Sequence, residues 1–164
     1  MTGMMTPVRS EREFIRGMVA HHQEAVDSAR VVFKNTERRE LRGFAAGVVE
    51  VQEREIGTLR GWLEAWYPNA PKNVPYTPMM RAALPDATPD ESDRAFLEDM
   101  VVHHEMAVDM SKRFLTGNFE KRPETEALAQ EIIDAQTDEV ETLRGWLRSW
   151  YNAALPAGNG HNGN

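Results

Sequence analysis

Hydrophobic residues recur along the chain at the three- and four-residue spacing of amphipathic helices. From about residue 10 to 34, one stripe contains Phe14, Met18, His21 and Ala25, so we expect a helix with one buried face. From about residue 37 to 67, a second stripe is apolar at both ends and polar at its middle. Its members are Leu41, Ala45, Val48, Gln52, Glu55, Leu59, Trp62 and Trp66.

Two further helices are expected in the second half of the chain, from 89 to about 115 and from 123 to 151. Ser10 and Glu13, and again Thr88 and Glu91, have the spacing of a capping box, which marks a helix start. Pro123 suits the first turn of the last helix. The pattern therefore predicts an all-α chain of four long helices.

The second helical pair repeats the first. Residues 14–27 and 96–109 share 8 identities in 14 positions, and residues 52–67 and 136–151 share 10 in 16. Two hairpins that each bury one face make a four-helix bundle. The fold predicted is thus a four-helix bundle built from a duplicated antiparallel helical hairpin.

These boundaries predict one domain over 10–151. Hairpin one covers 10–67 and hairpin two covers 89–151, while 1–9 and 156–164 are expected to be flexible tails. The proline-rich linker 68–88 is long for a compact domain. A crossover that returns along the bundle explains its length, because 21 extended residues can span a helix of ~25 residues.

Four of the five histidines lie in two adjacent pairs, His21-His22 and His103-His104. Each pair is followed by a Gln-x-x-Glu step, at Gln52 and Glu55 and then at Gln136 and Glu139. Counted from the turns, His21 and Gln52 are about equally distant from Thr36, so each histidine pair should face its own Gln/Glu pair across the hairpin. We therefore expect one polar layer at the middle of the bundle.

Buried carboxylates and imidazoles must satisfy one another or hold an ion. Imidazole and carboxylate are ligands for copper, zinc, iron and nickel. We therefore predict a divalent transition metal as cofactor and partner of this layer. The candidate ligands are His21, His22, Glu55, His103, His104 and Glu139; the weaker candidates are Gln52, Gln136, Met18, Met100 and Met110.

The composition of the chain excludes several kinds of partner and ligand. A net charge of −7 argues against nucleic acid as a partner, and no apolar run is long enough to span a membrane. The chain has no cysteine, which excludes thiolate ligands. Met1 to Arg9 contains no signal-peptide core.

The motif Met-x-x-His-His-x-x-Ala, followed by Gln-x-x-Glu and Trp-Leu, resembles the bacterial family called domain of unknown function 305. That resemblance covers both hairpins and implies a ferritin-like four-helix bundle. It also implies that the protein is exported, to the periplasm or the extracellular space. Some relatives bind copper through Met and His, which favours copper here and a role in metal buffering, storage or tolerance.

Two alternatives remain open. The first is a metal-free structural or interaction bundle, in which the polar layer only fixes the pairing of the helices. The second is a ferritin-like redox enzyme, but the Glu-x-x-His pair of di-iron bundles is absent. An enzymatic activity is therefore not favoured, and no catalytic residue or organic cofactor is expected.

Overall fold

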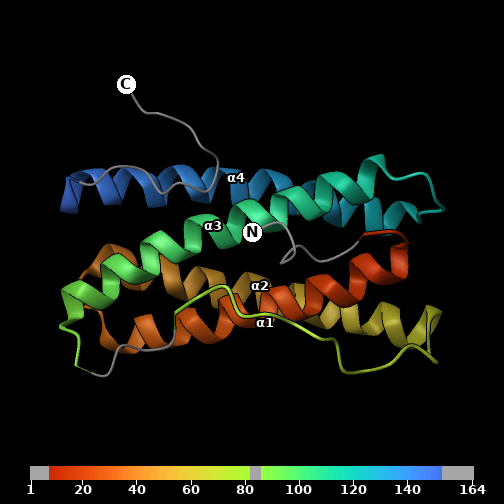
Figure 1. Ribbon diagram of the computed structural model, residues 1–164, viewed down its shortest axis with the longest axis horizontal. Coiled ribbons are helices and arrows are strands. Elements are labelled where there is room, and N and C mark those ends of the chain that lie inside the picture. Colours follow the sequence, from red (N-terminus) through yellow and green to blue (C-terminus); the bar gives the residue numbers. More distant parts are fainter. Residues whose placement is uncertain (1–7, 82–85, 153–164) are drawn as a thin grey trace.

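The computed structural model describes residues 8–81 and 86–152. Its four helices are α1 (Glu11–Asn35), α2 (Arg39–Trp66), α3 (Pro89–Thr116) and α4 (Pro123–Tyr151). They form the predicted all-α bundle, without strands in the described ranges (Figure 1). None of these helices is long and apolar enough to cross a membrane.

The helix ends follow from their local sequences. The Ser10 hydroxyl accepts a hydrogen bond from the Glu13 amide, and Thr88 and Glu91 form a reciprocal capping box. Each interaction satisfies amide groups that have no partner within the first turn. The four helices begin and end within about two residues of the predicted bounds.

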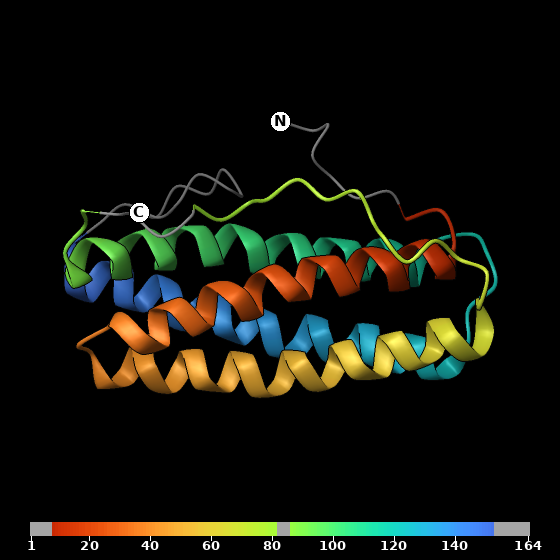
Figure 2. The same ribbon diagram turned by 90° about the horizontal axis from the view of Figure 1, so that it is seen from below.

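The two hairpins, α1–α2 and α3–α4, pack mainly through α1 and α3. These two helices are antiparallel (Figure 1). Phe14 near the start of α1 stacks on Phe114 near the end of α3, while Thr36 after α1 bonds Asp93 near the start of α3. The chain must therefore return along the bundle between α2 and α3. Figure 2 shows the described part of this segment, residues 68–81, lying along one face, over α1 and α3.

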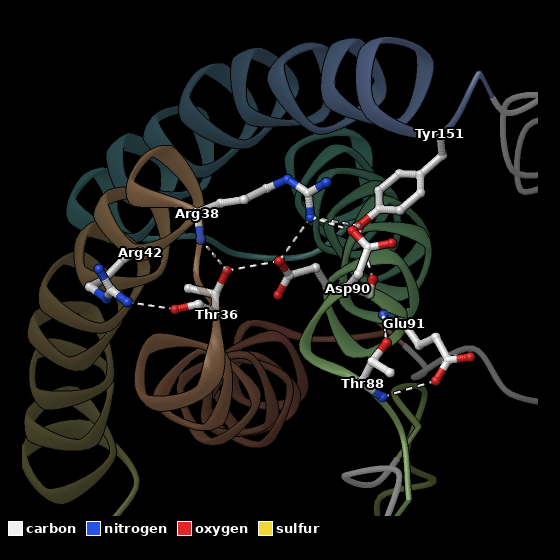
Figure 3. Close-up of polar contacts among 8 residues, drawn as sticks. Thr36, Arg38, Arg42, Thr88, Asp90, Glu91 and Tyr151 are labelled. Carbon is white, nitrogen blue, oxygen red and sulfur yellow. Dashed lines mark hydrogen bonds and ion pairs between the residues drawn. The ribbon is translucent and has the colours of Figure 1, made fainter.

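Polar clamps join the hairpins at both ends of the bundle. At one end, Arg38 bonds Asp90 and Asp93, and the Tyr151 hydroxyl donates to Asp90 (Figure 3). At the other end, Arg122 and the Tyr67 hydroxyl both donate to Glu11. Arg38 also lies over the Trp150 ring and Arg122 over the Trp66 ring. The Trp-Tyr ends of α2 and α4 thus close the two ends of the bundle.

Candidate metal centre

A polar layer separates two apolar clusters at the middle of the bundle. Its histidines and glutamines are buried, whereas the side chains of Glu55 and Glu139 are 13% and 32% exposed. One cluster includes Leu41, Leu97 and Leu143, and the other includes Phe14 and Phe114. In every helix the polar residues lie between members of the two clusters. They are His21 and His22 in α1, Gln52 and Glu55 in α2, His103 and His104 in α3, and Gln136 and Glu139 in α4.

Each Glu of the layer contacts the second histidine of its own hairpin. His22 Nε2 lies 2.6 Å from Glu55 Oε1, and His104 Nε2 lies 2.6 Å from Glu139 Oε1. These contacts confirm the predicted pairing across the hairpins. An ionised carboxylate can accept hydrogen bonds but cannot donate them. Each histidine Nε2 therefore carries the proton of its contact. Each Nδ1 then keeps its lone pair, and neither has a hydrogen-bond partner among the described residues.

The first histidines of the two pairs meet each other between the hairpins. The rings of His21 and His103 stack with centroids 3.7 Å apart, and both residues are 1% exposed. Burial and the neighbouring histidines hold the pKa of both imidazoles well below the ordinary value of 6.5. Both rings are therefore neutral at pH 7, which is the form that binds metals.

The polar layer thus divides into three contacts rather than one continuous cluster. Two are His–Glu pairs within hairpins, and the third is the His21–His103 stack between them. The amides of Gln52 and Gln136 are also buried, and their Oε1 atoms have no described hydrogen-bond partner. The helical stripes gave the correct layer but could not give the rotamers that split it.

Two residues of this region were missed by the sequence reasoning, Glu24 and Tyr76. Glu24 Oε1 lies 3.3 Å from His103 Nε2 and accepts a 2.6 Å hydrogen bond from the Tyr76 hydroxyl. Tyr76 also places its ring edge-on to His21, at 6.1 Å between centroids. Burial and Glu24 raise the pKa of Tyr76 far above its ordinary value, so its hydroxyl remains a donor.

The candidate methionines flank the layer. Met18 and Met110 are fully buried in one apolar cluster, and Met100 is fully buried in the other. Met18 and Met100 each lie one helical turn before a histidine pair. Their thioethers therefore belong to the packed walls next to the imidazoles.

The donor atoms of the residues in this layer suit a metal ion. Both ring nitrogens of His21, and Nδ1 of His22, His103 and His104, are buried without a described hydrogen-bond partner. Buried polar atoms are normally satisfied, so a cluster of free imidazole nitrogens suits a cation. Among the described residues, however, no three His, Asp or Glu side chains already converge on one point. Binding would therefore require side-chain rotation.

The sequence profile described as Domain of unknown function (DUF305) matches residues 11–118 and 93–164. Together these segments cover most of the chain.

The chain belongs to the DUF305 family.

Solved structures extend this result. This DUF305 chain is 32% identical to CopM in its Cu(II)-bound form, over 87% of this chain and 98% of CopM, with a TM-score of 0.77. For CopM in a silver-bound form, obtained by co-crystallization, the identity is 34% over the same shares, with a TM-score of 0.75. A DUF305 fragment from Deinococcus radiodurans is 28% identical over 84% of this chain and 94% of its own, with a TM-score of 0.73. No protein of curated function matches.

The lowered pKa values of His21 and His103 predict a pH-dependent stability. The unfolded chain binds protons at these rings near pH 6.5, whereas the folded protein does so only at lower pH. The free energy of unfolding is thus unaffected by the titration of these two rings above pH 6.5. It falls as the pH drops from 6.5 toward their pKa values in the folded protein. The slope reaches about 1.4 kcal/mol per pH unit for each histidine. Urea unfolding of metal-free protein between pH 7.5 and 5 measures this loss.

The matched control is the variant with His21→Leu and His103→Leu. It should show a flatter profile between pH 6.5 and 5, where carboxylates contribute little. Equal slopes for the variant and the wild type would contradict the assignment of the acid sensitivity to these two rings.

Proposed function

We propose that this protein binds copper at its mid-bundle polar layer and acts in metal buffering, storage or tolerance. The observation that carries the proposal is the buried His21–His103 stack with its free ring nitrogens. A neutral imidazole is a ligand for copper, zinc, iron and nickel. CopM has been crystallised with Cu(II), Cu(I) and silver, and this similarity favours copper among these metals.

Each residue of the layer has a role in this proposal. His21 and His103 supply nitrogen ligands from the two hairpins, and His22 and His104 can add theirs through Nδ1. Glu55 and Glu139 hold the Nε2 protons of His22 and His104, so they orient these rings as partners of metal-binding histidines commonly do. The ion would thereby link the hairpins at the level where the packing of α1 and α3 is polar.

The number of thioether ligands influences which oxidation state of copper the site favours. Soft sulfur ligands favour Cu(I), whereas nitrogen and oxygen ligands suit Cu(II). Met18 and Met100 are buried beside the histidines, and Leu59 and Leu143 occupy positions where the resemblance places further methionines. The donor set is consequently richer in nitrogen than in sulfur.

Copper should stabilise the folded protein. A ligand that binds only the folded state raises the free energy of unfolding by about 2.7 kcal/mol when its free concentration is 100 times Kd. Thermal unfolding with Cu(II), and separately with Zn(II), measures the effect. We expect a larger shift with copper. No shift with either metal would overturn the proposed function.

A second candidate is a metal-free bundle in which the layer fixes helix pairing. The 2.6 Å His22–Glu55 and His104–Glu139 contacts favour it, because they satisfy part of the layer without an ion. Under this alternative, Glu55→Gln changes stability and the protein purifies without metal when no chelator is used. Elemental analysis of the native protein distinguishes the two functions.

The cellular location of the protein is part of the same proposal. Copper buffering outside the cytoplasm agrees with the export that the family resemblance implies. Fractionation of cells that carry the native gene tests this location, and recovery in the cytoplasmic fraction alone would contradict it.

A further inference from the structure

The described part of the crossover between α2 and α3, residues 68–81, is bound to the bundle at three places. We define the strap as residues 71–81. Near its start, the Arg16 guanidinium donates to the carbonyl oxygens of Pro71 and Asn73. At its end, the Arg81 amide and side chain donate to Asp99. The strap is therefore held on α1 at one end and on α3 at the other, over the face shown in Figure 2.

Glu24 forms the third and central attachment. Its Oε2 accepts hydrogen bonds from the amides of Met79 and Met80, at 2.9 and 3.0 Å, while its Oε1 accepts from the Tyr76 hydroxyl at 2.6 Å. One carboxylate thus binds three donors of the strap. Hydrogen bonds to a charged acceptor are among the stronger ones in proteins.

This attachment lies directly at the histidine stack. The Tyr76 hydroxyl is 3.5 Å from His103 Nε2, and its ring meets the His21 ring edge-on. The Tyr76 hydroxyl donates its one proton in the hydrogen bond to Glu24. Toward His103, the same oxygen can therefore act only as an acceptor. Tyr76 and Glu24 together therefore cover the side of the stack that faces the strap, and both histidines are almost fully buried.

Among the described residues, only one of the two repeats makes this attachment. The residue of the second hairpin that corresponds to Glu24 is Met106, which packs against an apolar cluster. Two histidine pairs and two Gln-x-x-Glu steps are repeated, but the crossover passes only once. The strap lies over both α1 and α3, but only α1 has a carboxylate at this position of the repeat.

We propose that the strap is a gate over the His21–His103 stack and that the Glu24–Tyr76 hydrogen bond is its latch. This proposal rests on the proposed function, because it names what controls exchange of the metal at the same site. Pro75 and Pro78 flank Tyr76 and restrict the backbone, so the strap moves as a short stiff segment. Opening it breaks the contacts of Glu24 and uncovers both imidazoles together.

Tyr76→Phe tests the latch, because it removes the hydroxyl and keeps the ring. Tyr67→Phe is the matched control: it removes a 2.7 Å Tyr–Glu hydrogen bond at the end of the bundle, away from the histidines. Cu(II) uptake is followed by stopped-flow quenching of tryptophan emission, and release is followed after mixing with a chelator. Hydrogen exchange at the Met79 and Met80 amides reports the strap without any metal.

We expect Tyr76→Phe to accelerate uptake and release of Cu(II) alike by about tenfold, which corresponds to the loss of about 1.4 kcal/mol from the closed state. The Kd should stay within threefold, because the latch is present with and without metal. Exchange at the two strap amides should accelerate by a similar factor. Tyr67→Phe should change none of these rates by more than twofold.

The possible failures are distinct. Copper binding by wild type with unchanged rates in Tyr76→Phe overturns the gate and leaves the proposed function intact. A higher Kd with an unchanged uptake rate also overturns the gate, because it identifies a ligand instead. Absence of copper binding by the wild type overturns the proposed function and the gate with it.

Discussion

Replacing His21 and His103 with leucine is expected to abolish tight copper binding while the bundle stays folded. In the described layer, the His21–His103 stack is where imidazoles of the two hairpins meet each other directly. Loss of a group that merely orients a ligand lowers metal affinity by about 10–100-fold, so loss of two ligands should exceed about 100-fold. Titration with Cu(II) measures the change.

The stability of the same variant separates the two candidate functions. Both ring nitrogens of His21 and the Nδ1 of His103 are buried without a described hydrogen-bond partner, and unsatisfied buried polar groups are unfavourable. Leucine is apolar and similar in size, so the free energy of unfolding of the metal-free protein should be unchanged or raised by about 1 to 2 kcal/mol.

A layer that exists only to fix helix pairing gives the opposite result. The variant would then lose cooperative unfolding or shift to other helix pairings, as when a buried polar contact specifies register. Urea unfolding together with sedimentation distinguishes these outcomes. Glu55→Gln is the comparison variant, because it keeps all four imidazoles and changes only a partner of His22.

Replacing Phe114 with alanine should cause the largest loss of stability among single substitutions in the apolar clusters. Phe114 is fully buried, stacks on Phe14 at 4.4 Å between centroids, and touches Phe119 at 5.8 Å. Removal of a buried phenylalanine costs about 3–5 kcal/mol, against a total of about 5–15 kcal/mol for an ordinary domain.

Phe33→Ala is the matched control, because Phe33 lies on α1, one of the two helices of this contact, and is 43% exposed. We expect it to change the free energy of unfolding by less than about 0.5 kcal/mol. The measurement is urea unfolding followed by circular dichroism. Equal losses for the two variants would show that the α1–α3 contact contributes less than its burial indicates.

The sequence predicted the fold and the height of the polar layer for a clear reason. Helical stripes have a fixed period, so the positions of His21 and Gln52 relative to Thr36 determine their level in an antiparallel hairpin. The His22–Glu55 contact confirms that count. The stripes alone do not give the relative direction of the hairpins, because a stripe has no direction. The length of the linker predicts it, since a crossover that returns along the bundle makes α1 and α3 antiparallel, and the contact of Phe14 with Phe114 agrees.

Glu24 and Tyr76 could not be placed from periodicity. Glu24 lies on the same helix as His21, but its hydrogen bonds go to the crossover. The crossover has no periodic pattern from which its path over the bundle could be predicted. Two signals did point to them. Glu24 differs from its counterpart Met106, and Tyr76 is the only aromatic residue between 68 and 88. Differences between two copies of a repeat therefore identify what the single crossover contacts.

The most direct test of the account is a crystal structure of the copper-loaded protein with anomalous diffraction measured at the copper edge. We predict a copper peak at bonding distance, about 2 Å, from ring nitrogens of His21 and His103. A peak elsewhere, for example at Met79 and Met80, or no ordered peak in protein that holds stoichiometric copper, would contradict the assignment of the metal centre to the polar layer.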